Sequence, residues 1–437
     1  MKNRLSPKTA SILLFILVFS LLFLGFYRNQ WQMVRQKKFS LFQKDVEGYV
    51  IARMVLTRQS GLFSNGGLLG WGDVIPEDVN EADYQNQYDT YLHGLSFQTY
   101  WPKKSHPGFQ GLFFSILDRI SPFSPSNNLR LFRMFASGLF AATLAGLVLW
   151  FYQDLGWLSA FFVFASILLS QWMTLFGRSL FFVSGFFYLP MLVLLLRLQR
   201  EKRGNQLSYQ QLFWLVFSYV LLKCMFNGYD FILPTLGMVA TPIVFYGILD
   251  KWNKDKFITR SITVILAALI AILISLIILS FQIMYVSESP QDGINYVIET
   301  SIRRTFGNDP SLLSIDENAS NASLWSILKI YLSEYYFNKF HIPYFAIIII
   351  FAIVSAIYLV SNRLRPGAPE RTPKGLSLIA TTWFSLLSPL SWYTIFKSLA
   401  YYHTHMNFLP WHMPFTIFGF GMCGYVIEAL FRHRKHI

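Results

Sequence analysis

Long apolar segments alternate with polar stretches along this chain, and many of them have the length that a membrane helix needs. The first runs from about Ala10 to Phe26 and follows a short basic start. An α-helix needs about 20 predominantly apolar residues to cross the hydrocarbon of a bilayer. Further segments of this kind lie at Leu131–Trp150, Leu158–Trp172, Leu180–Leu198, Leu212–Met225, Phe231–Leu249, Ile262–Ile283, Ile342–Val360, Leu376–Phe396 and Phe408–Phe431. The pattern predicts an all-α polytopic membrane protein with about ten transmembrane helices, built as one integral membrane domain over residues 1–437.

Two long segments interrupt this series without a span-length apolar run of their own. They cover residues 28–128 and 284–341. Loops of this length inside a compact protein are usually functional. In the first, aromatic and polar residues alternate, which is typical of short helices that lie on a membrane surface. We therefore expect interfacial helices in the first loop and look to both loops for the functional residues.

The composition supports a membrane protein and excludes an ordinary soluble one. Hydrophobic residues make up 54% of the chain, charged residues 14%, and the mean hydropathy is +0.40. A soluble fold of this size could not bury that much apolar surface. The net charge of +14 would suggest nucleic acid in a soluble protein. No nucleic-acid-binding motif is visible, so we expect membrane lipids and no nucleic acid among the partners.

The distribution of basic residues predicts the orientation. With the amino terminus in the cytoplasm and ten crossings, all strongly basic short segments fall on one side: Arg197–Arg203, Lys251–Arg260, Arg363–Lys374 and the tail Arg432–Lys435. Cytoplasmic loops of membrane proteins carry such an excess of Lys and Arg. Both termini are therefore predicted to be cytoplasmic and both long loops to lie on the outer side, as in a multi-pass protein of a bacterial inner membrane.

Two carboxylates follow the first apolar segment by about twenty residues, in the run Lys44-Asp45-Val46-Glu47-Gly48-Tyr49. A carboxylate at the outer bilayer surface can act as a general base on an acceptor hydroxyl, or it can help to bind a divalent cation. Asp45 and Glu47 are the candidate catalytic residues. The alternative is a pair of solvated acids beside Lys44.

Basic residues in the later outer loops are candidates for binding an anion. Arg303 and Arg304 lie in the second long loop, and Lys397 precedes the loop between the last two apolar segments. Arginine binds phosphate through two parallel hydrogen bonds, and lysine supplies a point charge. A lipid phosphate is the anion to be expected at that depth. The alternative for the arginines is snorkelling towards lipid headgroups.

Histidines complete the set of candidate substrate-binding residues. His403 and His405 share the last outer loop, and His106 lies in the first. We expect them to hydrogen-bond phosphate or sugar hydroxyls. A zinc site would need a further ligand at workable spacing, and His412 is separated from the pair by a Pro-Trp break. No metal site is therefore predicted, and a divalent cation is the one cofactor that this chemistry leaves open.

The layout resembles that of the membrane glycosyltransferases of the C-type (GT-C) fold, which use polyprenyl-phosphate-linked sugars. The match consists of a cytoplasmic amino terminus, one helix, a long outer loop with an early acid, and many helices with basic inner loops. In that family the acid of the first loop is catalytic, which implies this role for Asp45, with Glu47 as the near alternative. A common family motif has adjacent acids, whereas Val46 separates them here. The resemblance implies inverting transfer of a sugar from the lipid donor to a hydroxyl of a glycan, lipid or protein acceptor.

Two other classes fit parts of the pattern. A transporter or flippase for a lipid-linked solute often has two related halves, and no such symmetry is visible here. A surface-polysaccharide polymerase or ligase also has many helices and large outer loops with Arg and His. It would lack the acid just after the first helix, so Asp45 favours the glycosyltransferase.

Overall fold

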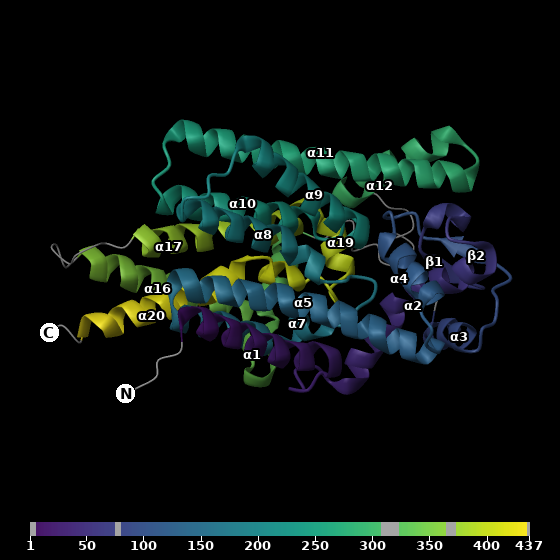
Figure 1. Ribbon diagram of the computed structural model, residues 1–437, viewed down its shortest axis with the longest axis horizontal. Helices are drawn as coiled ribbons and strands as arrows, with labels where there is room; N and C mark the ends of the chain where they lie inside the picture. Colours follow the sequence, from purple (N-terminus) through teal and green to yellow (C-terminus); the bar gives the residue numbers. More distant parts are fainter. Residues whose placement is uncertain (1–5, 75–79, 307–322, 364–372, 435–437) are drawn as a thin grey trace.

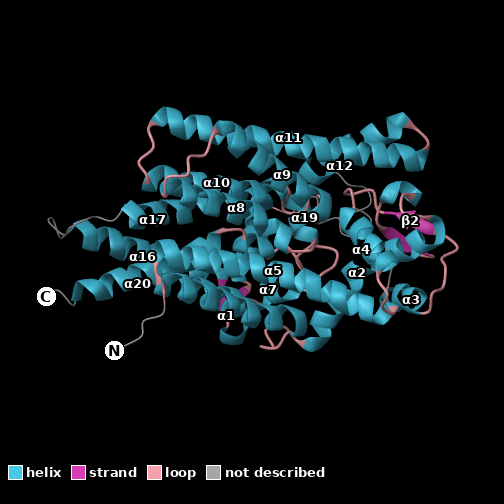
Figure 2. Cartoon of the chain, viewed as in Figure 1, coloured by secondary structure: helices cyan, strands magenta, loops and turns pink. Residues whose placement is uncertain are grey.

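The computed structural model describes residues 6–74, 80–306, 323–363 and 373–434. It is all-α apart from two small sheets, with 78% of residues in helices. Most helices run side by side along the long axis of the molecule, and the strands occupy only small parts of it (Figures 1 and 2). Helix α1 begins and α20 ends at one end of this bundle. We call the other end, which carries α2, α3, α4 and the β1–β2 sheet, the distal end.

The bundle helices correspond closely to the predicted apolar segments. They are α1 (Pro7–Arg28), α5 (Pro125–Leu155), α6 (Trp157–Leu168), α7 (Gln171–Phe176), α8 (Gly185–Lys202), α9 (Tyr209–Asn227), α10 (Ile232–Leu249), α11 (Lys254–Ser287), α16 (Tyr344–Arg363), α17 (Pro373–Ser385), α18 (Leu387–Ile395), α19 (Lys397–Tyr402) and α20 (Phe415–Arg434). Within the described residues, five helices are long and apolar enough to cross a membrane: α1, α5, α10, α11 and α16. A helical membrane protein is therefore the fold class that the structure supports.

Three predicted spans are broken rather than continuous, and in the segment over 408–431 a short 3-10 helix, η4 (Leu409–His412), precedes α20. The segment over 158–172 divides into α6 and α7 at Leu169–Ser170, where the Ser170 side chain caps α7 by accepting a hydrogen bond from the Met173 amide. The segment over 376–396 divides into α17 and α18 near Leu386. Only one or two polar residues mark each of the last two breaks, Ser170 and Gln171 in 158–172 and Ser385 in 376–396, which is too few to interrupt an apolar segment in a hydropathy pattern.

The two long loops are folded. The first contains α2 (Gln36–Ser60), η1 (Ser64–Gly67), β1 (Gly70–Gly72), α3 (Glu81–Leu92), β2 (Tyr100–Pro102) and α4 (Phe109–Ile120). The second contains α12 (Pro290–Phe306), α15 (Leu324–Ser333), β3 (Tyr335–Phe337), η3 (Asn338–Phe340) and β4 (Ile342–Pro343), and η4 (Leu409–His412) precedes α20. The expected helices of the first loop are present, and α2 with 25 residues is longer than a short surface helix.

The basic segments of the predicted cytoplasmic side meet at the end of the bundle opposite the distal end. Arg260 forms an ion pair of 2.6 Å with Glu201, and Lys202 lies 3.7 Å from Asp250. These contacts bring together the chain segments 197–203 and 250–260. Residues 364–372 and 435–437, which hold part of the other two basic segments, lie outside the described residues.

An asparagine turns the chain from α1 into α2. Asn29 ends α1 in the left-handed conformation, which Asn tolerates better than most residues. Its side-chain amide donates to the Val34 carbonyl at 2.6 Å and accepts from the Val34 amide at 3.3 Å. The indole of Trp31 folds back and donates to the Leu21 carbonyl at 3.1 Å. This closed turn fixes where α2 starts relative to α1.

A small antiparallel sheet and a glutamine hold α3 beside α2. Strands β1 and β2 pair with Trp71 opposite Trp101. Gln87 of α3 bonds both backbone groups of Gly72, accepting at 3.2 Å and donating at 2.9 Å. Gly48 of α2 lets the ring of Trp71 approach, because a Cβ there would lie 2.4 Å from the ring. Sheet, α2 and α3 therefore form one packed unit at the distal end.

We expect Gly48→Ala to destabilise the protein despite the higher helix propensity of alanine. The added methyl collides with the Trp71 ring, and overpacking of this kind costs about 1–3 kcal/mol. The measurement is the midpoint of thermal unfolding in detergent. Gly138→Ala in α5 is the matched control, because a Cβ there meets nothing within 4 Å. The control should be neutral or stabilising by up to about 1 kcal/mol; equal effects of the two substitutions would contradict this packing.

Candidate active site

Asp45 projects from α2 into a group of polar side chains that come from distant parts of the sequence. The carboxylate is half-buried and interacts with the hydroxyl of Tyr84 on α3. Lys103, directly after β2, and His405, in the loop between α19 and η4, are close enough for their charges to act on it. The chain positions of Asp45 and His405 are 360 residues apart. The fold thus brings the early acid and one of the late histidines together.

The environment moves the pKa values of these groups in opposite directions. Burial raises the pKa of the Asp45 carboxyl above its usual value, and His405, Lys103 and the Tyr84 hydroxyl oppose this rise. Burial, with help from the Asp45 charge, raises the pKa of Tyr84 to about 12. Tyr84 therefore stays protonated near neutral pH and can donate to Asp45.

The pKa of His405 is lowered, first by burial of the ring; Asp45 opposes this effect and Lys38 adds to it. An imidazole with a lowered pKa is largely neutral at pH 7, and it can then accept a proton or donate a hydrogen bond. The site thus combines a carboxyl group, Asp45, whose pKa is raised with an imidazole, His405, whose pKa is lowered. Such perturbed pairs are typical of functional sites, although structural networks produce them as well.

Lys103 is placed by the sheet and by aromatic rings. Pro102 pairs with Gly70, which ends β2 immediately before Lys103. The Lys103 amide donates to the Leu69 carbonyl at 2.6 Å. Its ammonium lies 4.0 Å from the ring centre of Tyr49 and 5.4 Å from that of Phe181. A cation over aromatic faces is held in place without a salt bridge that would cancel its charge.

The loop that carries His405 is anchored from several sides. Asn407 donates to the Leu399 carbonyl at 3.0 Å, and Tyr393 donates to the Asn407 carbonyl at 2.8 Å. Phe408 stacks on Trp172 at 4.8 Å, and the Lys38 ammonium lies 5.0 Å from the same indole. The beginning of α2 and the His405 loop are therefore joined through one tryptophan.

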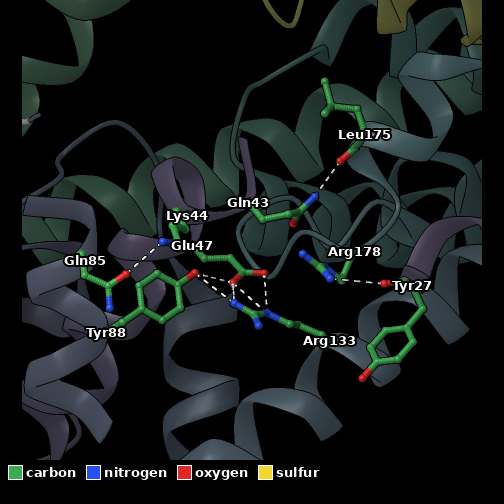
Figure 3. A network of polar contacts seen from close by, with 9 residues as sticks. All are labelled: Tyr27, Gln43, Lys44, Glu47, Gln85, Tyr88, Arg133, Leu175 and Arg178. Atoms are coloured by element: carbon green, nitrogen blue, oxygen red, sulfur yellow. Dashed lines mark hydrogen bonds and ion pairs between the residues drawn. The ribbon is translucent and has the colours of Figure 1, made fainter. Parts of the chain in front are cut away.

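Glu47 lies on the opposite face of α2 and is completely buried. Arg133 of α5 donates to its carboxylate at 2.6 Å, and the Tyr88 hydroxyl donates to the same oxygen at 2.7 Å (Figure 3). Side chains two residues apart on a helix point about 200° from each other, because each residue turns the helix by about 100°. The helix therefore gives Asp45 and Glu47 different surroundings. Glu47 is placed as one half of a buried ion pair.

A second arginine faces the same acid. The charge of Glu47 acts on Arg178, in the turn between α7 and α8. Arg178 donates to the Tyr27 carbonyl at 3.3 Å, and its guanidinium lies 4.6 Å from the ring centre of Phe39. Gln43 of α2 donates to the Leu175 carbonyl at 2.8 Å. These contacts tie α2 to α1, α5 and the α7–α8 turn (Figure 3).

The structure also contains an apolar cavity of about 170 Å³, which none of the four polar residues Asp45, Tyr84, Lys103 and His405 lines. Its walls come from α10, α11, α12, α18 and α19, and Lys104 and Ser105 lie at its edge. They directly follow Lys103 in the chain. The indole N–H of Trp392, a buried wall residue, finds no hydrogen-bond acceptor among the described residues. The cavity thus presents apolar walls with a few polar groups, as sites for amphipathic ligands do.

Three other predicted site residues, His106, His403 and Lys397, lie within the described part of the chain. His106 is buried, with Nδ1 3.0 Å from Ser105 Oγ and Nε2 3.3 Å from the Gln110 amide nitrogen. The ring of His403 lies 5.3 Å from that of His405, edge to face. Lys397 is half-buried at the start of α19.

The two predicted arginines belong to the last turns of α12. The backbone of Arg303 and Arg304 is helical, and their side chains lie outside the described residues. Within the described ranges, no group of three or more His, Cys, Asp or Glu side chains could hold a metal ion. The site as described is therefore built from Asp45, Tyr84, Lys103 and His405.

Sequence reasoning missed Tyr84 and Lys103 as members of this site, and Arg133 as the partner of Glu47. Tyr84 sits among the polar residues of α3, and Lys103 is one of two adjacent lysines. No short motif marks either of them. The pairing of β1 with β2 determines where Lys103 lies. Both strands have only three residues, which is too short for an alternating pattern to be recognised in the sequence.

No family model, curated protein or solved structure matches this chain.

We expect Glu47→Leu to destabilise the protein by about 3–5 kcal/mol, because Arg133 is left as a buried charge without its partner. The double substitution Glu47→Leu with Arg133→Leu should recover part of that loss, since it removes both charges together. Thermal unfolding of the purified variants measures both effects. A single substitution that leaves the unfolding midpoint unchanged would contradict a structural role for this ion pair.

Proposed function

We propose that the protein is a membrane glycosyltransferase of the GT-C type that moves a sugar from a polyprenyl-phosphate donor to an acceptor hydroxyl. One observation carries the proposal: an acid shortly after the first membrane helix interacts with Lys103 and His405, and Lys104, the next residue in the chain, lines an apolar cavity. Each of these features matches one part of the donor. The cavity suits the apolar lipid, Lys103 and His405 suit the anionic phosphate, and Asp45 suits the polar sugar at which the reaction occurs. The proposed acceptor is a glycan, a lipid or a protein.

In this proposal the bundle crosses the membrane about ten times. Both termini lie in the cytoplasm, and the distal end faces the outer side, as in a bacterial inner membrane. The meeting of the basic segments 197–203 and 250–260 at the end opposite the distal end supports this orientation. The membrane would then supply the donor laterally, while the acceptor approaches from the aqueous side.

Asp45 is proposed as the general base. Its carboxylate takes the proton of the acceptor hydroxyl as the hydroxyl oxygen bonds to the anomeric carbon. The bond between that carbon and the phosphate oxygen breaks, and the polyprenyl phosphate leaves with the electron pair. Attack from the side opposite to the leaving group inverts the anomeric configuration. The raised pKa of Asp45 suits a base that must hold the proton after transfer.

Lys103 and His405 are proposed to stabilise the leaving phosphate, Lys103 through its positive charge and His405 through a hydrogen bond from its neutral ring. Negative charge grows on the phosphate oxygens as the bond breaks, and fixed positive groups and hydrogen-bond donors lower the barrier to that change. Lys103 and His405 flank Asp45 and are the described residues placed to do this. Arg303, Arg304, Lys397, His403 and His106 remain proposed contacts of the donor headgroup or the sugar.

Asp45→Asn should reduce transfer by about 100- to 10,000-fold, the usual contribution of a general base. The assay measures release of polyprenyl phosphate from a panel of polyprenyl-phosphate-linked sugars by protein in lipid nanodiscs. Glu81→Gln, an exposed acid on α3, is the matched control and should keep full activity. Full activity of Asp45→Asn in a folded protein would exclude Asp45 as the base.

The acidic limb of the pH–rate profile should report the ionisation of Asp45 and lie above the usual aspartate range, because burial raises its pKa. Lys103→Met removes a cation, and His405→Ala removes a ring whose protonated form lowers the pKa of Asp45, so the limb should move to higher pH in both variants. Tyr84→Phe should act in the same direction. Lys44→Met is the control, because Lys44 bonds Gln85 and does not shift Asp45. A limb that stays in place in all variants would argue against this assignment.

Filling the cavity should discriminate between donors by their lipid length. Leu276→Trp puts a large ring into the cavity wall, so we expect a raised KM for a long-chain polyprenyl donor and little change for a water-soluble short-chain analogue. Leu273→Trp on the exposed side of the same helix is the control. Equal effects on both donors would show that the cavity does not take the lipid.

A further inference from the structure

Helix α12 has an apolar stripe that no described part of the chain covers. Ile294, Ile298 and Ile302 follow one another at helical spacing and are 54%, 52% and 51% exposed. Residues four apart on a helix lie on one face. On the neighbouring exposed positions, α12 carries the polar residues Asn295 and Glu299. It is therefore amphipathic in a way that its packing on the protein does not explain.

Helix α12 packs antiparallel against the last turns of α11. The contact is close at Gly293, where a Cβ would lie 2.4 Å from the Ser280 carbonyl oxygen and 2.5 Å from the Met284 side chain. The glycine allows the two backbones to approach. Beyond this contact α12 runs back along α11, so that Val297 and Leu276 line the same cavity.

The isoleucine stripe and the exposed face of α11 lie on the same side of this helix pair. On α11, Leu276 and Leu279 line the cavity, while Phe281 and Tyr285 are 62% and 69% exposed. On α12, Tyr296 lines the cavity and Ile294 points to the other side. With 100° between successive residues, the two exposed sets fall on the flank opposite the cavity. They form one continuous apolar surface.

The length of α11 sets the depth of that surface. No charged residue occurs between Arg260 and Glu288, and Arg260 is paired with Glu201 at the end opposite the distal end. About 20 residues beyond Arg260 span the hydrocarbon of a bilayer, which places its far boundary near Ser280. Because α12 meets α11 at the level of Ser280 and runs back along it, the isoleucine stripe begins at this boundary.

We propose that α12 rests its isoleucine stripe on the acyl chains of the leaflet at the distal end and forms the wall between those chains and the cavity. The partner is lipid rather than another protein, because the stripe continues the uncharged exposed face of α11. Tyr285, at the upper end of this face, has the position of an interfacial aromatic residue. This proposal concerns membrane contact and holds whether or not the protein transfers a sugar.

Spin labels on α12 test the proposal in the full chain reconstituted into phospholipid vesicles. Cysteines are introduced singly at Ile298, on the stripe, and at Asn295, on the polar face, and each is labelled with a nitroxide. Both native cysteines are buried, and the unsubstituted chain gives the background. Collision with dissolved oxygen, which concentrates in lipid, is compared with collision with a water-soluble nickel chelate.

The Ile298 label should collide several-fold more with oxygen than with the chelate, and the Asn295 label should show the reverse preference. An Ile298 label as accessible to the chelate as the Asn295 label would place the stripe in water and overturn the proposal. A label shielded from both reagents would mean that protein covers the stripe, which would also overturn it. A second pair of labels, at Ile294 and Glu299, repeats the comparison if either first variant fails to fold.

Discussion

The buried ion pair between Glu47 and Arg133 is the interaction on which the presentation of the site depends. It joins α2, which carries Asp45, to α5, one of the helices long enough to cross a membrane. A fully buried carboxylate is tolerated only when it is paired and hydrogen-bonded, and Glu47 has both the guanidinium and the Tyr88 hydroxyl. Because Glu47 is held from one side, the opposite face of α2 is fixed as well. Asp45 is on that face, beside α3 and the His405 loop.

The same ion pair distinguishes the two acids of the Asp45–Glu47 run. As a loop, either acid could turn towards a substrate. In a helix, the two carboxylates point away from each other. Glu47 forms an ion pair with Arg133, which neutralises its charge. Asp45 has no such partner among the described residues. Burial raises the pKa of its carboxyl group, and Lys103 and His405 lower it. The buried ion pair of Glu47 therefore favours Asp45 over Glu47 as the proposed base.

The positions of most helices could be predicted from the sequence, because long apolar runs leave few alternatives. The breaks inside 158–172 and near Leu386 could not, since only one or two polar residues mark each of them. The candidate site was foreseen only in part. Asp45 and His405 follow from their places near the ends of apolar segments, whereas Tyr84 and Lys103 depend on a small sheet and on the bonds of Gln87 to Gly72. Such tertiary contacts between short elements leave no periodic signal in the chain.

A structure of the protein in a nanodisc with a polyprenyl-phosphate-linked sugar bound would show whether Asp45 is placed to act as the base. We expect the phosphate to lie between Lys103 and His405 and the anomeric carbon to face Asp45 across a space for an acceptor hydroxyl. The first isoprene units should occupy the cavity lined by Leu276 and Trp392. A headgroup bound elsewhere, with Asp45 remote from the sugar, would contradict this role for Asp45.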